Sequence, residues 1–112
     1  MSDTKIAHHR LLREVLRNYL TFESLCQQSG SYVISHAGFD ISFIDLQNAL
    51  KDLSPRKREA VYYNVILDWK QKDVAAKMGI TTVSVGQYVE QAMIQVSKRY
   101  FDSHDFVEDQ GQ

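Results

Sequence analysis

The stretch WKQKDVAAKMGITTVSVGQYVEQAMIQVSKRY, residues 69–100, decides the fold. In its first third, Val74, Ala75 and Met78 recur at the spacing of one helix face. Gly79 follows where a helix C-terminus often needs a left-handed residue, a conformation that glycine adopts at little cost. The alanine is small enough to let a second helix approach closely. The pattern therefore predicts a helix that ends at the glycine and packs against the next segment.

A second, longer helix is predicted after this turn. Ile80 is expected to re-enter the core, and Thr81 or Thr82 to cap the helix, because a threonine hydroxyl accepts a bond from a free backbone N–H. An apolar stripe at helical spacing follows, comprising Val85, Tyr88 or Val89, Ala92, Met93 and Val96. Two helices joined by so tight a turn are typical of a helix-turn-helix, whose second helix enters the DNA major groove.

The sequence before this stretch extends the pattern. LSPRKREAV at residues 53–61 precedes KQKDVAAKMGI and TTVSVGQYVEQAMIQVSKRY, and together they resemble region 4 of bacterial sigma factors and the phage regulators built on the same module. The positions that carry the resemblance are Leu53, Pro55, Arg58, Glu59, Asp73, Val74, Ala75, Met78, Gly79, Ile80, Thr81, Val85, Ala92, Lys98 and Arg99. The resemblance implies a DNA-binding protein of bacterial or phage origin.

The resemblance also implies which side chains meet DNA. Base edges would be contacted from the start of the second helix by Thr82, Val83, Ser84, Gly86 and Gln87. Gln87 can bond an adenine edge in two places, and Thr82 or Val83 can meet a thymine methyl. Sigma factors usually carry arginines and a glutamate here, and this chain has neither, so arginine–guanine contacts are not expected. Phosphates would be contacted by Arg56, Lys57, Arg58, Lys70, Lys72 and Lys77.

The distribution of charge agrees with this assignment. The whole chain carries a net charge of −1, but residues 55–99 hold eight basic and four acidic side chains. Residues 1–54 have a net charge of −1, and residues 100–112 have a net charge of −4. The positive segment therefore coincides with the helix-turn-helix, where phosphate contacts would be made. Its net charge of +4 is modest, so non-specific DNA binding should be weak and salt-sensitive.

The expected fold class is all-α, a helical bundle with a C-terminal helix-turn-helix and an N-terminal accessory helix. Residues 1–39 are assigned to that accessory helix and a connector, and residues 40–101 to the sigma region 4-like domain. Residues 102–112 are assigned to an acidic tail, which is expected to fray after the long helix ends near Tyr100. Trp69 is expected to cover the core beneath the helix-turn-helix.

The N-terminal helix is predicted to run from Thr4 to Gln28. Its wide apolar face consists of Leu12, Val15, Leu16, Tyr19, Leu20 and Phe22. Packing against the rest of the chain is the favoured role, and dimerisation or docking to a polymerase is the alternative. Residues 28–39 are expected to be an irregular connector without a sheet, because a lone short strand cannot stabilise itself.

Two further helices are predicted before the helix-turn-helix. The first covers residues 41–53, is capped by Asp40 or Ser42, and has a core side of Ile41, Ile44, Leu46, Leu50 and Leu53. The second covers residues 55–67. Ser54 should cap it, and the following proline occupies the first helical position, where its missing N–H costs nothing. Its buried residues are expected to be Ala60, Val61, Val65 and Ile66.

Several kinds of site are not expected. No Ser-His-Asp, Cys-His, phosphate-loop or paired-carboxylate arrangement appears at useful spacing, so neither a catalytic site nor a cofactor is predicted. His8 and His9 lack a nearby carboxylate or cysteine, which argues against a metal site, and Cys26 is expected to be a buried structural thiol. The chain has neither an apolar signal core at its start nor a run of ~20 apolar residues, so a cytoplasmic protein without a membrane partner is expected.

Three functions agree with these features. The first is a transcription regulator that reads a promoter or operator in double-stranded DNA, beside RNA polymerase or as a homodimer through its N-terminal helix. The second is a sigma-mimic interaction protein that binds RNA polymerase or a regulator and scarcely touches DNA. The third is the small DNA-recognition subunit of a phage terminase. The chain lacks the aromatic-basic segment with which sigma factors melt DNA, so a stand-alone region 4-like regulator or one part of a split factor is expected.

Overall fold

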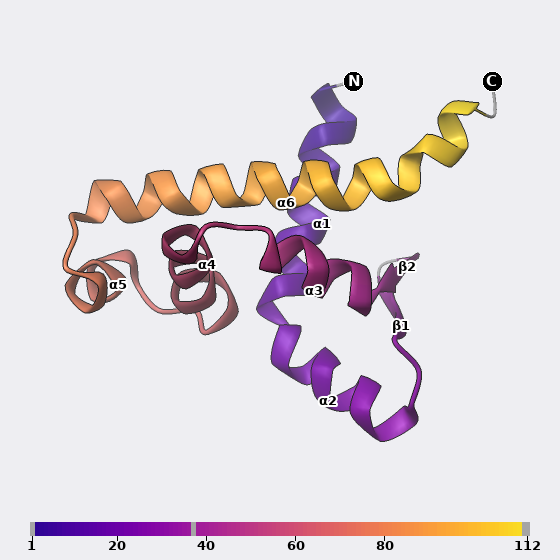
Figure 1. The fold of residues 1–112 in the computed structure, drawn as a ribbon, viewed down its shortest axis with the longest axis horizontal. Coiled ribbons are helices and arrows are strands. Elements are labelled where there is room, and N and C mark those ends of the chain that lie inside the picture. The colour runs from indigo at the N-terminus through magenta and orange to yellow at the C-terminus, as the bar shows by residue number, and fades with distance from the viewer. Residues whose placement is uncertain (1, 37, 111–112) are drawn as a thin grey trace.

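The computed structural model describes residues 2–36 and 38–110, with side chains described for residues 9–36 and 38–101. Along the chain these residues form α1 (Ser2–Arg17), α2 (Tyr19–Ser29), β1 (Val33–His36), β2 (Phe39–Ser42), α3 (Phe43–Lys51), α4 (Pro55–Val61), the π-helical turn η1 (Tyr62–Ile66), α5 (Gln71–Met78) and α6 (Thr82–Gln110). Figure 1 shows α6 as the longest element, with α3, α4 and α5 along one side and α1 crossing it. The mostly α-helical fold confirms the predicted class.

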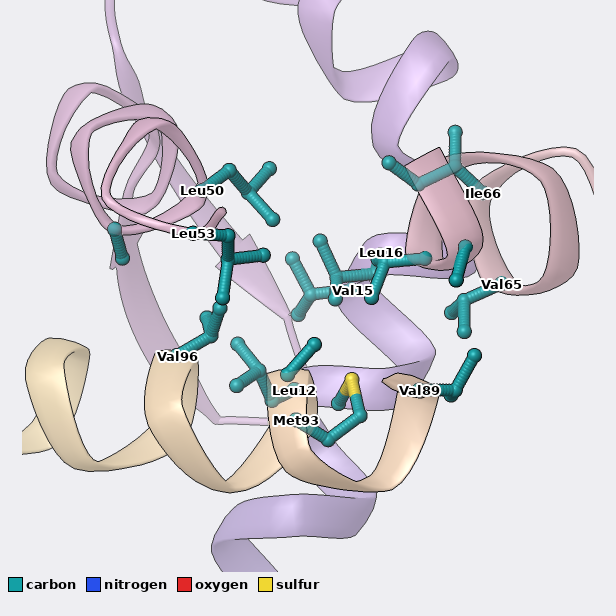
Figure 2. Close-up of a cluster of buried hydrophobic side chains, with 14 of the residues drawn as sticks. Leu12, Val15, Leu16, Leu50, Leu53, Val65, Ile66, Val89, Met93 and Val96 are labelled. Atoms are coloured by element: carbon teal, nitrogen blue, oxygen red, sulfur yellow. The ribbon is translucent and has the colours of Figure 1, made fainter. Parts of the chain in front are cut away.

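The core lies between α6 and the helices that pack on it. The predicted stripe of the long helix is buried, comprising Val85, Val89, Ala92, Met93 and Val96. The side chains that converge on it come from α1, from the end of α3 and the residues after it, and from η1, as Figure 2 shows: Leu12, Val15, Leu16, Leu50, Leu53, Val65 and Ile66. Because α1 shares this core, the N-terminal helix is held against the helix-turn-helix by apolar packing.

Three of the predicted helix caps are confirmed. The hydroxyls of Ser42, Ser54 and Thr81 each accept a hydrogen bond from the backbone N–H three residues further on. These bonds satisfy donors that the first turn of a helix leaves free. Pro55 occupies the first turn of α4, and Gly79 ends α5 with a left-handed φ of 70°. The local signals in the sequence therefore fix where these helices begin and where α5 ends.

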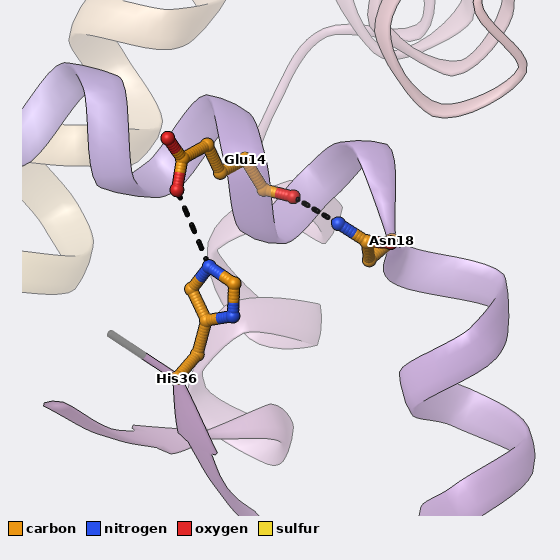
Figure 3. Close-up of polar contacts among 3 residues, drawn as sticks. All are labelled: Glu14, Asn18 and His36. Carbon is orange, nitrogen blue, oxygen red and sulfur yellow. Dashed lines mark hydrogen bonds and ion pairs between the residues drawn. The ribbon is translucent and has the colours of Figure 1, made fainter. Parts of the chain in front are cut away.

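The N-terminal segment breaks where a single helix was predicted. The expected helix from Thr4 to Gln28 is divided at Asn18, whose side-chain amide donates to the Glu14 carbonyl at 2.9 Å, as Figure 3 shows. An asparagine that bonds a backbone carbonyl competes with the helical hydrogen-bond ladder, which explains the break. Since α2 then leaves the axis of α1, the prediction that Leu20 is buried is wrong, and its side chain is exposed.

The prediction of an irregular connector without a sheet is also wrong. Strands β1 and β2 pair antiparallel, with Val33 opposite Ser42 and His36 opposite Phe39. Strand β2 consists of the residues around Asp40 and Ser42, the two candidate helix caps. Strand β1 therefore has a partner and does not stand alone. The hairpin is tied to distant elements, because His36 Nε2 lies 3.3 Å from a Glu14 carboxylate oxygen of α1 (Figure 3).

The start of α3 differs from the prediction by two residues, and this changes its buried face. With Ser42 as the cap, Phe43 and Leu46 point inward, whereas Ile44 is exposed, contrary to the prediction. Ile41 is buried as expected, but from strand β2. The remaining predicted core residues of this part are buried: Leu46, Leu50, Leu53, Ala60, Val61, Val65 and Ile66.

The two ends of the helix-turn-helix region also show details that the sequence did not predict. After η1, Asp68 adopts a positive φ of 60°, and Trp69 stacks on Tyr63 with ring centroids 4.6 Å apart. At the other end α6 continues to Gln110, so it passes Tyr100, where the sequence predicted its end. The side chains of the predicted acidic tail, residues 102–112, lie outside the described residues.

Candidate nucleic-acid interface

The helix-turn-helix is formed by α5, the turn at Gly79 and the start of α6. The Ile80 N–H donates to the Ala75 carbonyl at 3.0 Å, which closes the turn behind the left-handed glycine. Val74 and Val85, one from each helix, are both fully buried. The two helices are therefore locked together on their inner sides, and the first turns of α6 are fixed in direction.

The predicted base-contacting residues lie at this fixed end of α6. Thr82, Val83 and Gln87 are exposed, and Ser84 and Gly86 are partly exposed. Val83 leaves 69% of its surface exposed, the largest fraction among the exposed large hydrophobic side chains of the described residues. An apolar side chain left this open at the end of a capped helix is available to an outside partner.

Ser84 has a second role that limits its freedom. Its backbone N–H donates to Thr81 Oγ1 at 3.0 Å, and the Thr81 hydroxyl donates to Ser84 Oγ at 2.9 Å. The serine hydroxyl is therefore part of the cap. Among the predicted base contacts, this places Thr82, Val83 and Gln87 in the freest positions.

Gly86 lies beside a residue that the sequence did not single out. A Cβ added to Gly86 would stand 3.7 Å from the side-chain amide of Gln71, the first residue of α5. The exposed glutamine therefore borders the predicted reading surface. Gln71 could have been noticed in the sequence as a polar residue at the start of the first helix of the motif. Nothing in the pattern distinguished it from its neighbours, so it was not predicted to contact DNA.

The predicted phosphate-contacting residues fall into two groups. Four already have contacts within the molecule. Arg56 donates to the Met78 carbonyl at 3.4 Å, and Lys57 donates to Gln95 Oε1 at 3.3 Å. The Arg58 guanidinium donates to the Lys51 and Leu53 carbonyls at 3.2 Å and 3.0 Å, and the Lys77 ammonium lies 5.9 Å from the centre of the Tyr63 ring.

Lys70 and Lys72 form the second group. Both are exposed at the start of α5, and their side chains make no hydrogen bond or ion pair with another described residue. They border a shallow pocket of about 620 Å³ together with Asp68, Trp69 and Asp73. Free ammonium groups at a helix N-terminus suit an anion, because the unpaired N–H groups of the first turn carry positive partial charge.

The remaining predictions from the sequence concern metal, thiol and membrane sites. Cys26 is buried and free, as predicted. Within the described residues no group of three or more His, Cys, Asp or Glu side chains is placed to hold a metal ion, and the side chain of His8 lies outside those residues. No helix in the described part of the chain combines the length and apolar character needed to cross a bilayer.

Comparison with known protein families gives a match over part of the chain. The family model described as Sigma-70, region 4, matches residues 43–96, which begin with α3 and end within the buried stripe of α6. No curated protein sequence and no solved structure gave a significant match. The matched segment contains the caps Ser54 and Thr81, the left-handed Gly79 and the exposed start of α6. Over residues 43–96 the chain is therefore similar to sigma-70 region 4, and its helix-turn-helix lies within the matched segment.

Proposed function

We propose that this protein is a transcription regulator that reads a promoter or operator in the DNA major groove with the first turns of α6. The observation that carries the proposal is the exposure of Thr82, Val83 and Gln87 at the end of a helix whose direction is fixed by its cap and its buried stripe. A rigid element that presents its polar and apolar side chains outward is what direct readout of base edges requires.

The chemistry of these three residues favours A·T base pairs. A glutamine amide donates to and accepts from the major-groove edge of adenine, and the methyl groups of valine and threonine pack on the thymine methyl. The described reading positions contain no arginine, which is the commonest partner of guanine. The preferred site should therefore contain adenine and thymine at the positions nearest Gln87 and Val83.

Lys70 and Lys72 would bind the backbone phosphates beside these bases. Their freedom from contacts with other described residues supports this assignment over that of Arg58, whose guanidinium closes the end of α3. A contact to phosphate fixes the register of the reading helix but carries no sequence information. Loss of one lysine should consequently weaken binding to every sequence alike.

Selection from a random duplex library, followed by titration of the selected duplex at about 50 and 200 mM salt, tests the proposal. We expect a selected A·T-containing site and affinity that falls with salt. Gln87→Ala should relax the preference at one position by about 1–3 kcal/mol. The matched control is Gln91→Ala, one turn further along α6, which should leave the base preference unchanged. Failure to select any site would remove the proposal.

Lys72→Ala tests the phosphate assignment separately. It should weaken binding to selected and unrelated duplexes equally and lower the salt slope by about 0.9, since each phosphate contact releases close to one counterion. Loss of affinity for the selected duplex alone would contradict this role and place the lysine among the base contacts.

The alternative function is a sigma-like interaction protein that binds RNA polymerase with little contact to DNA. It is favoured by the four basic side chains already engaged within the molecule and by an apolar pocket of about 260 Å³ bordered by Tyr19, Leu50 and Tyr62. Pull-down of purified RNA polymerase by a protein that shifts no DNA at low salt would support this alternative.

Mass measurement in solution separates the remaining possibilities. Among the described side chains of α1 and α2, a homodimer could use exposed Leu20 and Leu25 of α2, because Leu11, Leu12, Val15 and Leu16 of α1 are already buried in the core. A terminase subunit would instead form a ring, so a mass several times that of the 12.9 kDa chain would favour that function. A monomeric mass would favour a regulator that binds DNA with a single helix-turn-helix.

A further inference from the structure

A pocket joins the N-terminal helix to the reading surface. Its volume is about 370 Å³, and it is bordered by His9 and Arg13 of α1, by Gln71 at the start of α5, and by Gly86 and Glu90 of α6. The family match does not include α1, since it begins at residue 43. The pocket therefore places two side chains from outside the matched segment on the same opening as Gly86, one of the residues proposed to contact bases.

The charged side chains of α1 point in different directions. Glu14 is the only acidic residue in the part of α1 whose side chains are described, and it faces the hairpin, where its carboxylate meets His36 at 3.3 Å (Figure 3). Arg13 lies one position earlier and borders the pocket beside the helix-turn-helix. Consecutive helical residues are about 100° apart around the axis, so the two charges occupy different sides of the helix. Beside the apolar face with which α1 packs on α6, the charged side chain at the pocket is therefore basic, and the acidic one lies elsewhere.

Arg13 makes no ion pair with a carboxylate among the described residues, although Glu90 borders the same pocket. A guanidinium that is not paired with a carboxylate keeps its donors for an incoming anion, and it matches phosphate geometry with two parallel N–H groups. His9 adds at least one ring N–H donor next to it. The chemistry of this side of α1 suits a phosphate group.

We propose that Arg13, with His9 beside it, binds a backbone phosphate of the DNA that α6 reads, so that the N-terminal helix is part of the DNA interface. This inference rests on the proposed function. Gln71 lies between Lys70 and Lys72 in sequence and also borders the pocket, so the pocket connects Arg13 to the phosphate contacts proposed at the start of α5. A helix in the major groove is flanked by phosphates, because the groove is only about 12 Å wide.

The experiment uses the full chain and a labelled, mixed-sequence DNA duplex several helical turns long, with binding followed by fluorescence anisotropy at several salt concentrations. Arg13→Ala should raise Kd about eightfold at about 0.1 M salt and lower the salt slope by about 0.9, the value of one phosphate contact. The matched control is Arg17→Ala, which removes the same charge from the same helix but does not border the pocket. It should leave the slope unchanged.

Two further variants keep the test decisive if Arg13→Ala alters the fold. Arg13→Lys retains the charge and should retain most of the binding. Glu90→Gln removes a carboxylate that would repel a phosphate in the pocket, so it should tighten binding and leave the melting temperature close to that of the parent. No tightening by Glu90→Gln, or equal binding by the Arg13→Ala and Arg17→Ala variants, would overturn the inference.

The failure of this inference can be told apart from failure of the proposed function. If Lys72→Ala weakens binding while Arg13→Ala does not, the helix-turn-helix binds DNA without help from α1, and only the inference is wrong. If the parent protein binds no duplex even at about 50 mM salt, both are wrong.

Discussion

The helix-turn-helix and the N-terminal arm, which we define as α2 and the hairpin over residues 19–42, are held in different ways. In the first, a left-handed glycine, a threonine cap and fully buried Val74 and Val85 all lie within a short stretch of chain. In the second, Leu25 and Phe39 are about half exposed. The arm is fixed instead by contacts between residues that are far apart in sequence.

Two of these contacts show the difference most clearly. Glu14 and His36 are separated by 22 positions, and the Tyr100 hydroxyl accepts a hydrogen bond from the Ser42 N–H across 58 positions. Such contacts require the rest of the fold to be in place before they form. The reading end of the molecule is therefore determined locally, whereas the arm depends on the assembled core.

The largest expected loss of stability comes from a substitution within the helix-turn-helix. Ala75→Glu places an unpaired carboxylate where α5 packs on α6, at a residue that is 6% exposed. We expect a loss of about 4 kcal/mol in the free energy of unfolding, because the charge has no partner and no room. Ala76→Glu, at the exposed neighbouring position, is the control and should change the stability by less than about 0.5 kcal/mol. Equal melting temperatures for the two variants would contradict the packing.

The next effect concerns the arm. Phe43 is fully buried and lies against Tyr19 with ring centroids 4.9 Å apart, so it holds α2 against α3. Phe43→Ala should cost about 3 kcal/mol by the usual loss for a buried phenylalanine. Phe39→Ala, at an exposed ring, should cost far less. Hydrogen exchange should show lost protection in α2 and the hairpin first, while α5 and the start of α6 keep theirs. Uniform loss throughout the chain would remove the distinction between the two regions.

The same distinction explains what the sequence could predict. Ser54, Thr81 and Gly79 are recognisable because each acts on its own neighbours, so the start of α4, the end of α5 and the start of α6 follow from residue type. The segment around Asn18 could continue as a helix or break, and residues 28–42 could be irregular or form a hairpin. The sequence nearby allows both conformations in each case, and contacts with the rest of the fold determine which one forms. Periodicity alone therefore placed Leu20 and Ile44 on the wrong face.

The candidate interface divides in a similar way. Thr82, Val83 and Gln87 were placed by their position in a motif. Whether a basic side chain is free depends on what lies opposite it in the folded chain, and sequence gives no sign that Arg58 bonds the carbonyls that end α3. For the same reason, that Arg13 and Gly86 border one pocket appears only once α1 packs across α6.

A smaller effect tests a long-range tie. Tyr100→Phe removes the acceptor of the Ser42 N–H at 3.1 Å and should cost about 1 kcal/mol at neutral pH, the usual net value of one hydrogen bond. Chemical denaturation measures this difference. Tyr32→Phe, at a more exposed ring of the arm, should be close to neutral and serves as the control.

The pH dependence of the same variant sharpens the test. Burial raises the pKa of Tyr100 above its ordinary value of 10.0, with the Asp45 carboxylate acting in the same direction and the hydrogen bond from Ser42 opposing both. The stability that this neutral phenol contributes is complete below pH 10.0 and is lost as the pH rises through the raised pKa. The parent should therefore lose stability in that range more steeply than Tyr100→Phe. Parallel curves would show that this phenol is not the group responsible.

The smallest effect has opposite signs at two glycines of the helix-turn-helix. Gly79→Ala should destabilise the fold by about 1 kcal/mol, because an L side chain is strained at its φ of 70°. Gly86→Ala should stabilise it by about 0.8 kcal/mol, since alanine favours a helix interior and the new Cβ would meet the Gln71 side chain at an ordinary 3.7 Å. Thermal melts measure both differences.

The affinity of the Gly86→Ala variant for the selected duplex then tests whether the glycine in the reading helix serves DNA binding. A Gly86→Ala protein that is more stable but binds DNA more weakly would mean that the missing side chain lets the DNA approach α6 closely, at the expense of helix stability. A variant that is more stable and binds equally well would remove Gly86 from the proposed interface. Gln71, which borders the same position, would then remain as the polar group on that side of the helix.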